Sequence, residues 1–205
     1  MTNAMIKNDK RWIGDLLGGS LMVRESRTIA ELLLSEPDET TWQQQIIKEN
    51  ILQASSTSTA NRYARTLRLR LMTLDRECWQ LIADGSESER LQMLLVALMI
   101  QSPIVAEFVA EVVNPARQQF KEKLGMNCWG EFVDENLRLH PELAAFSDSS
   151  IQKMGNNLIK ALAEAGYLDS PRRRNLQNVF LLPDVATALH RLNKAELLPI
   201  LEGNA

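Results

Sequence analysis

Cysteine, aromatic residues, glycine and proline are all scarce in this sequence. Only two of its 205 residues are cysteine, and Cys78 and Cys128 lack the spacing of a metal site, which argues against a disulfide scaffold and against a zinc site. Aromatic residues make up 5% of the chain, and nine glycines and seven prolines stand against 31 leucines. This composition favours helix over strand.

The short motifs of common enzyme classes are absent as well. Gly18, Gly19 and Ser20 are not followed by the Lys-Ser/Thr pair of a phosphate-binding loop, and the chain has no Gly-x-Ser-x-Gly and no His-Glu-x-x-His. His140 and His190 lie far apart in sequence, which favours structural or exposed histidines over a catalytic pair. We therefore predict a non-enzymatic protein with no catalytic residues, no metal, no cofactor and no small-molecule substrate.

Long apolar runs are also missing. The most apolar stretch, residues 91–113, contains two glutamines, Pro103, Glu107 and Glu111. A membrane span needs roughly 20 mostly apolar residues, and a carboxylate near its centre costs about 2.5–3.5 kcal/mol. The N-terminus has no apolar run typical of a signal peptide. We predict buried helices in this region, no membrane partner and a cytoplasmic location.

Helix start and stop signals divide nearly the whole chain into helices. Thr41 is predicted to cap a helix over residues 42–52, and the Ser/Thr residues 55–59 to cap a longer one over residues 60–74. Ser86 and Glu89 form a capping-box pair before an apolar helix over residues 91–100. Further helices are expected over residues 24–34, 76–83, 104–113, 114–125, 128–139, 141–146, 151–165, 184–192 and 194–202, and residues 147–150 are predicted to cap the one over residues 151–165.

One segment near the C-terminus has a different pattern. Residues 167–168, a polar tip over residues 169–175 and an apolar run over residues 176–182 predict a short β-hairpin. The fold class is therefore all-α, a compact multi-helix globular fold with this winged-helix-like hairpin. We expect a helical body over residues 1–146 and a winged-helix-like C-terminal segment over residues 147–205, packed together as one unit.

The formal net charge of −3 is unevenly distributed. Residues 1–60 carry −2 and residues 80–150 carry −6, whereas residues 61–79 carry +3 and residues 151–205 carry +2. The overall acidity argues against a nucleic-acid partner, but the two basic islands point to one.

The first basic island lies on the predicted helix over residues 60–74. At about 100° per residue, its apolar side chains share one face, whereas Arg62 and Arg65 lie on the opposite arc and Arg68 lies beside it. A row of guanidinium groups suits phosphate, because each is always charged and forms a planar fork. The alternative is a solvated outer face, or arginines paired with acidic helices of the same fold.

The second basic island combines a helix with the predicted hairpin tip. Lys153, Asn157 and Lys160 lie on the polar side of the helix over residues 151–165, and the tip carries three adjacent arginines, Arg172, Arg173 and Arg174. This order resembles the recognition helix and wing of a winged helix-turn-helix, where asparagine pairs with adenine and lysine with guanine. The alternative is a helical hairpin whose arginines only keep a loop soluble.

Three stretches together resemble the BrxA family of BREX bacteriophage-exclusion systems. They are GGSLMVRESRTIAELLL at residues 18–34, the Ser/Thr loop and arginine helix at residues 55–74, and SSIQKMGNNLIKALAEAGYL at residues 149–168. The resemblance covers roughly the whole chain and implies a compact all-α fold similar to the antitermination factor NusB. It also implies double-stranded DNA binding, a role in antiviral defence and phage resistance, and other BREX proteins as partners.

The leading hypothesis is therefore a double-stranded DNA-binding accessory protein of phage defence. Contacts should be mainly to phosphates, through both basic islands. One alternative is a protein–protein adaptor that uses the acidic surface of residues 84–142, and another is an RNA-binding factor suggested by NusB. The nucleic-acid-binding candidates are Arg62, Arg65, Arg68, Lys153, Asn157, Lys160, Arg172, Arg173 and Arg174.

Overall fold

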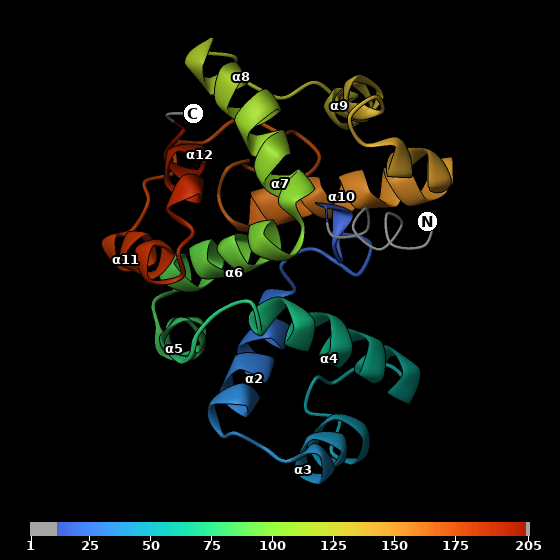
Figure 1. Ribbon diagram of the computed structural model, residues 1–205, viewed down its shortest axis with the longest axis vertical. Helices are drawn as coiled ribbons and strands as arrows, with labels where there is room; N and C mark the ends of the chain where they lie inside the picture. The colour runs from blue at the N-terminus through green and yellow to red at the C-terminus, as the bar shows by residue number, and fades with distance from the viewer. Residues whose placement is uncertain (1–11, 204–205) are drawn as a thin grey trace, which may run out of the picture.

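The computed structural model describes residues 12–203, and all of its regular elements in that range are helical. Figure 1 shows two halves, one made by the helices from α2 to α5 and the other by the helices from α6 to α12. The first described residues pass between them before entering α2. The predicted all-α fold class is confirmed.

The N-terminal half is built on α2, which packs against both α4 and α5. Its elements are α2 (Val23–Leu34), α3 (Glu39–Gln43), the π-helical turn η1 (Gln44–Lys48), α4 (Thr57–Leu71) and α5 (Arg76–Asp84).

The C-terminal half is built around α6, in which every residue from Gln92 to Met99 is buried. The helices from α7 to α8 form one rod without a break. The elements are α6 (Glu87–Gln101), α7 (Pro103–Phe108), η2 (Val109–Val113), α8 (Asn114–Gln118), α9 (Cys128–Asn136), η3 (Pro141–Ala145), α10 (Asp148–Glu164), α11 (Pro183–Arg191), η4 (Ala195–Leu197) and α12 (Leu198–Glu202).

The capping signals of the sequence place several helix starts correctly. Ser86 and Glu89 make both hydrogen bonds of a capping box at the start of α6. Ser56, from the predicted Ser/Thr loop, caps α4, and Ser147 caps α10. Gly166 follows α10 with a φ of +81°, the left-handed conformation expected just beyond a helix end.

Two predicted helix boundaries are wrong. Asp38, not Thr41, caps the helix that contains Trp42, because the Asp38 carboxylate accepts the Thr41 backbone N–H at 2.7 Å. The helix expected over residues 114–125 begins without a break from α7 and ends at Gln118, so Gly125 does not terminate it. Asn114 is fully buried within the rod, and Pro115 continues the helix directly after the π-helical turn η2.

The predicted β-hairpin near the C-terminus is not confirmed. Residues 167–182 make one antiparallel bridge of their own, between Leu168 and Leu176, and no strand is assigned to them. A second bridge pairs Asn175 with Lys123, which follows α8. The residues of the tip therefore pair partly with another region of the chain instead of with one another.

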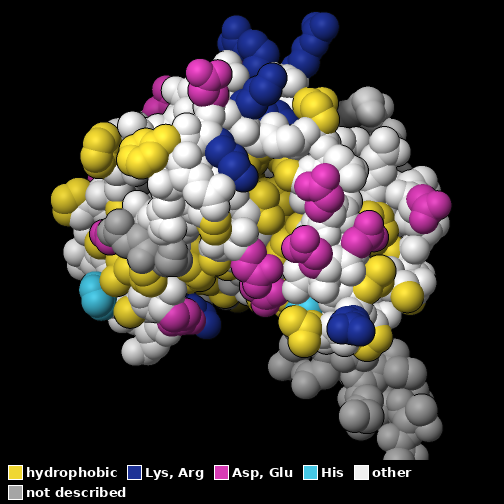
Figure 2. Space-filling view, turned by 90° about the horizontal axis from the view of Figure 1, so that it is seen from above, with side chains coloured by type: hydrophobic (Ala, Val, Ile, Leu, Met, Phe, Trp, Pro, Cys, Tyr) yellow, Lys and Arg dark blue, Asp and Glu magenta, His cyan; other side chains and the backbone are white. Residues whose placement is uncertain are grey.

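Within residues 12–203, no single helix has the length and apolar composition needed to cross a membrane. The apolar stretch noted in the sequence is divided between α6 and the rod of α7 and α8, which meet at a bend of 114°. Figure 2 looks down on the end of the molecule formed by α8 and α9. Hydrophobic, acidic and basic side chains are interspersed on this end, with most of the visible Lys and Arg side chains along one edge.

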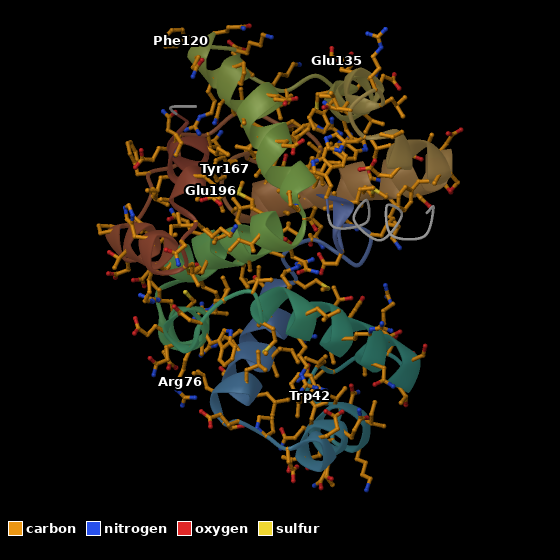
Figure 3. All side chains as sticks on the ribbon, in the orientation of Figure 1. Trp42, Arg76, Phe120, Glu135, Tyr167 and Glu196 are labelled. Carbon is orange, nitrogen blue, oxygen red and sulfur yellow. The ribbon has the colours of Figure 1, made fainter. Side chains whose placement is uncertain are left out.

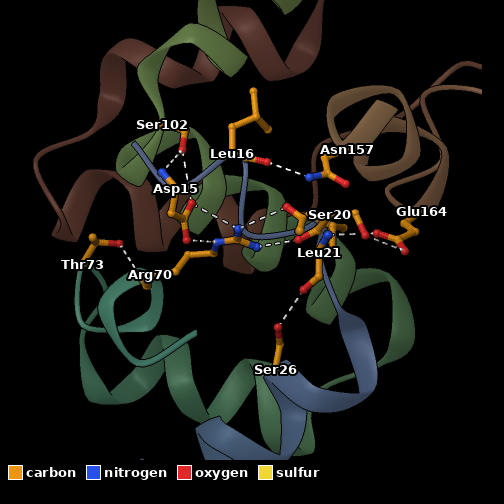
Figure 4. A network of polar contacts seen from close by, with 11 residues as sticks. Asp15, Leu16, Ser20, Leu21, Ser26, Arg70, Thr73, Ser102, Asn157 and Glu164 are labelled. Atoms are coloured by element: carbon orange, nitrogen blue, oxygen red, sulfur yellow. Dashed lines mark hydrogen bonds and ion pairs between the residues drawn. The ribbon is translucent and has the colours of Figure 1, made fainter. Parts of the chain in front are cut away.

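Residues 12–21, here called the strap, lie between the two halves and are hydrogen-bonded to both (Figure 4). On the side of the C-terminal half, the Asp15 N–H donates to Ser102 Oγ at 3.1 Å, and Glu164 of α10 accepts from the Leu21 N–H at 2.9 Å. Gly14 has a φ of +57°, and a Cβ there would collide with the carbonyl oxygen of Gln101. Any residue with a side chain at position 14 would therefore force the strap away from its observed path.

Arg70 of α4 holds the other side of the strap and is completely buried, with 0% exposure. Its guanidinium donates to both carboxylate oxygens of Asp15, at 3.1 and 3.3 Å, and to the carbonyl oxygens of Ser20 at 2.6 Å and Gly19 at 3.4 Å. A buried charge is tolerated only when it is paired and hydrogen-bonded in this way.

Loss of Arg70 should be strongly destabilising. Arg70→Ala would leave the Asp15 carboxylate without its counter-charge, which typically costs about 3–5 kcal/mol. The double variant Asp15→Leu/Arg70→Met removes both charges and should recover most of that loss. Urea unfolding at neutral pH measures both, and a loss below about 1 kcal/mol, the size expected for an exposed ion pair, would contradict the assignment.

A second ion pair ties α11 to the start of α5. Arg191 donates to the two carboxylate oxygens of Asp75 at 2.6 and 3.1 Å, while Asp75 also caps α5 by accepting the Cys78 N–H at 2.9 Å. The hydrogen bonds from Arg191, reinforced by the one from the Cys78 backbone, hold the pKa of Asp75 well below its usual range.

This depressed pKa predicts a specific dependence of stability on pH. A carboxylate whose pKa is lowered by folding stabilises the fold above its unfolded pKa, about 3.9, and loses that contribution as the pH falls. Asp75→Asn keeps a capping oxygen but removes the charge. The difference in unfolding free energy between wild type and Asp75→Asn should therefore be largest near neutral pH and shrink below about pH 4. A difference that stays constant across this range would show that the charge is not responsible, and Asp134→Asn serves as the control for an exposed carboxylate elsewhere.

Candidate nucleic-acid interface

Arg62 and Arg65 project from the exposed side of α4, as their positions in the sequence predict. No ion pair within the described residues involves either of them, and the Arg62 guanidinium lies 4.9 Å from the ring centre of Tyr63. Both line a groove of about 900 Å³ between α3 and α4. Their charges are therefore open to a ligand.

Arg68, on the same helix, is partly engaged within the fold. It pairs with Glu39 at 3.1 Å, and its guanidinium lies 4.3 Å from the ring centre of Trp42. Figure 3 shows Trp42 between α3 and α4. Since Glu39 already offsets its charge, Arg68 contributes less free positive charge than Arg62 and Arg65.

The predicted contact residues of α10 face the strap. Lys153 is exposed and makes no ion pair in residues 12–203, whereas Lys160 lies 3.7 Å from Glu164. Asn157 is half-buried, and its amide Nδ2 donates to the carbonyl oxygen of Leu16 at 2.8 Å. Because this side chain holds the strap in place, we leave it out of the contact set proposed below.

The strap contacts both α4 and α10. On α4, Thr66 lies against Gly18 of the strap, and Arg62 is one turn nearer the helix start. On α10, Lys153 is likewise one turn before Asn157. Both helices begin on the same side of the molecule (Figure 1). The surfaces of α4 and α10 that carry the exposed cations Arg62, Arg65, Lys153 and Lys160 are here together called the strap face.

The three arginines of the tip have different environments. Arg172 is exposed and makes no ion pair in the described chain, and Arg173 pairs with Asp169 at 2.9 Å but remains 70% exposed. Arg174 instead turns inward with a φ of +59°, and its Nη1 donates to the carbonyl oxygens of Gly125 at 3.1 Å and Met126 at 2.9 Å. It fastens the tip to the segment that follows α8.

Two lysines that the sequence reasoning missed join this tip. The bridge between Lys123 and Asn175 places Lys123 in a notch of about 390 Å³ together with Arg172 and Arg173, and Lys121 is exposed nearby in sequence. The sequence predicts a helix over residues 114–125 in an acidic region. Nothing in the local sequence therefore indicates that these lysines lie near the arginines of the tip. We call Lys121, Lys123, Arg172 and Arg173 the tip cluster.

The second basic island of the sequence is therefore divided in space. Lys153 and Lys160 lie on the strap side of α10, whereas Arg174 lines a groove with Gln152 and Ile159. The two sides are about 100° apart around the helix axis. The lysines of α10 and the arginines of the tip therefore lie on different sides of this helix.

A family model described as BrxA matches residues 10–193 of the sequence. The chain belongs to the BrxA family. It is 68% identical over 200 residues to the BREX protein BrxA of Escherichia coli O9:H4 (strain HS), and the match covers 98% of this chain and 94% of that protein. It is 31% identical over 186 residues to the BREX protein BrxA of Paramagnetospirillum magneticum (strain ATCC 700264 / AMB-1), covering 91% and 94%.

The fold of this BrxA-family chain is also found in a solved structure. A crystal structure of an uncharacterized protein from Magnetospirillum magneticum matches with a TM-score of 0.85 and 28% sequence identity, covering 94% of this chain and 99% of that one. The two halves are thus arranged as in that structure. Because the chain belongs to the BrxA family and its relatives are named as BREX proteins, it is a BREX-system protein.

The BrxA-family chain has a further groove, of about 620 Å³, between α9, η3 and α10. Trp129, Val133 and Ile151 contribute apolar surface, and Asp134 and Asp148 lie at its polar positions. The α9 side of this groove belongs to the acidic middle region noted in the sequence, whereas its α10 side and Arg174, which also lines it, do not.

Neither cysteine of this BrxA-family chain has the environment of a reactive thiol. Cys128 has one cation beside it among the described residues, since Arg174 Nη1 lies 3.9 Å from its sulfur. Burial nevertheless outweighs Arg174 and raises the pKa of Cys128, and burial raises the pKa of Cys78 to about 12. No group of three His, Cys, Asp or Glu side chains within residues 12–203 could hold a metal ion.

Proposed function

We propose that this BrxA-family chain is a non-enzymatic double-stranded DNA-binding accessory protein of a BREX phage-defence system. The observation that supports this most directly is the presence of exposed cations without ion-pair partners in a chain whose net charge is −3. Arg62, Arg65 and Lys153 on the strap face and Arg172 in the tip cluster are such cations among the described residues. The proposal includes a cytoplasmic location and the NusB-like fold expected from the sequence.

Binding through phosphates accounts for this arrangement of charges. Guanidinium groups form bidentate, charge-assisted hydrogen bonds with phosphate oxygens, and such contacts hold a protein on DNA without reading its sequence. No exposed asparagine is assigned to base reading here, since Asn157 is bound to the strap. We therefore expect weak sequence preference.

Duplex affinity should fall steeply as salt concentration rises. Each neutralised phosphate releases condensed counterions, so log K should decrease linearly with log salt, with a slope near −0.9 per contact. Fluorescence anisotropy of a labelled duplex between about 50 and 200 mM salt measures this slope. The proposal would be ruled out if the protein does not bind the duplex at low salt, or if its affinity does not change with salt concentration. A structured RNA that displaces the duplex would favour the RNA-binding alternative.

Charge-removing variants test which cations take part. Arg62→Ala/Arg65→Ala and Arg172→Ala/Arg173→Ala should each weaken binding to all sequences alike, and each should lower the salt slope by about two. The matched control is Arg27→Ala/Lys194→Ala, which removes two charges held in exposed ion pairs on α2 and beside η4. If the control weakens binding as much as the test variants, only net charge matters and neither basic surface is an interface.

A second candidate function is that of an adaptor for other BREX proteins. The groove between α9, η3 and α10 favours it, because an apolar floor with Asp134 and Asp148 beside it suits a partner segment with apolar and basic side chains. Leu137 lines this groove and is 37% exposed, while Leu139 is 75% exposed and lies outside it.

The adaptor function predicts a groove-dependent complex. After nuclease treatment, co-purification of co-expressed BREX proteins with this chain should persist for wild type and Leu139→Glu and be lost for Leu137→Glu. A charge placed in an apolar contact is desolvated without a partner, whereas the same charge at an exposed position is not. Co-purification that nuclease abolishes would point back to DNA as the link.

A further inference from the structure

Phe120 ends the rod formed by α7, η2 and α8 and is almost completely exposed. Its relative exposure is 93%, and Figure 3 shows it at the far end of the rod. The Phe120 N–H donates to the Arg117 carbonyl oxygen and the Lys121 N–H to the Ala116 carbonyl oxygen, both at 2.9 Å. Phe120 itself has a φ of +54°, so it occupies the left-handed position that closes a helix and is usually glycine.

The fold gains nothing from a phenyl ring at this position. A left-handed backbone is unfavourable for a bulky residue, and the exposed ring leaves apolar surface in water. Six other non-glycine residues within residues 12–203 have a positive φ, and none of them is aromatic. A residue that breaks local rules without compensation marks a functional position more often than a structural one.

The surroundings of Phe120 carry positive charge. Residues 120–125 and 169–175 together hold five basic and two acidic side chains, a net charge of +3. Lys121 follows the ring directly, and Lys123 shares its notch with Arg172 and Arg173. Arg174 fixes these two segments to each other through its hydrogen bonds to Gly125 and Met126, so the segments that carry these cations are held side by side.

An exposed aromatic ring next to a basic segment matches the chemistry of a nucleic acid, which presents phosphates outside and flat apolar bases inside. We infer that Phe120 inserts between two adjacent base pairs of duplex DNA while the tip cluster holds the flanking phosphates. Apolar wedges of this kind enter the minor groove, partly unstack one base step and kink the duplex. Flexible pyrimidine–purine steps would be the easiest to open.

This inference rests on the proposed DNA binding, and the test separates the two. The probe is a duplex of about 20 base pairs with a fluorescent donor and acceptor at its ends, because a kink of 20–90° brings the ends closer. Anisotropy of the same duplex first establishes saturation for each variant, so that loss of bending is not confused with loss of binding. The variants are Phe120→Ser, Phe120→Gly and Phe120→Leu, and the matched control is Phe180→Ser, which alters a ring that is 83% exposed but lies outside the cluster.

Wild type, Phe180→Ser and Phe120→Leu should bend the saturated duplex, since leucine also serves as a wedge. Phe120→Ser and Phe120→Gly should lose less than about tenfold in affinity and leave the bound duplex as straight as free DNA. Phe120→Gly should unfold at the same or a higher temperature than wild type, because glycine suits the left-handed backbone. This last result separates a wedge from a packing residue.

Four results would overturn the inference. A saturated but straight duplex with wild type, or equal bending by wild type and Phe120→Ser, would contradict the wedge and leave the proposed DNA binding intact. If Phe120→Ser changes the oligomeric state, measured by light scattering, but leaves the bending of the duplex unchanged, the ring belongs to a contact between proteins. Failure of wild type to bind the duplex at low salt would remove the proposed function and the wedge together.

Discussion

The buried ion pair between Arg70 and Asp15 is the interaction on which the arrangement of both halves depends. Arg70 belongs to α4, and Asp15 belongs to the strap, which is hydrogen-bonded in turn to Ser102 and to α10. Through these contacts one arginine sets the position of α4 relative to α10. The helices that carry the exposed cations of the strap face are therefore linked through a buried cation of α4.

The arginines of α4 illustrate what a sequence can predict. Helical periodicity places Arg62 and Arg65 opposite the apolar face, and they are exposed, because burial follows the turn of a helix. The same periodicity does not identify Arg70 as buried, since its partner Asp15 lies 55 residues away. A contact between distant segments leaves no trace in local patterning. The caps at Ser86 and Ser147 were predictable for the opposite reason, because donor and acceptor lie within one turn.

The tip cluster shows the same limit at the candidate site. The three adjacent arginines stand out in the sequence, but the bridge from Asn175 to Lys123 decides which cations surround them. The local sequence pattern also does not distinguish Arg174 from Arg172. Arg174 is hydrogen-bonded to backbone carbonyl oxygens, whereas Arg172 is exposed and available to a ligand. The sequence thus predicts which residue types the candidate interface contains. Which cations lie together, and that they form two separate groups, can be seen only in the folded structure.

An acidic protein that binds DNA must rely on short-range contacts. At physiological ionic strength charges are screened within about 8 Å, so a net charge of −3 gives no long-range attraction, and the −6 of residues 80–150 repels phosphate near it. Within residues 12–203, the exposed cations of the strap face and the tip cluster are the groups that we propose for phosphate binding, and two of them, Lys121 and Lys123, lie inside this acidic region. Phosphate contacts also weaken as salt rises. A ring that inserts between bases adds a contribution that salt does not screen, and this explains why a residue so unfavourable for the isolated fold would stand beside the cations of the tip.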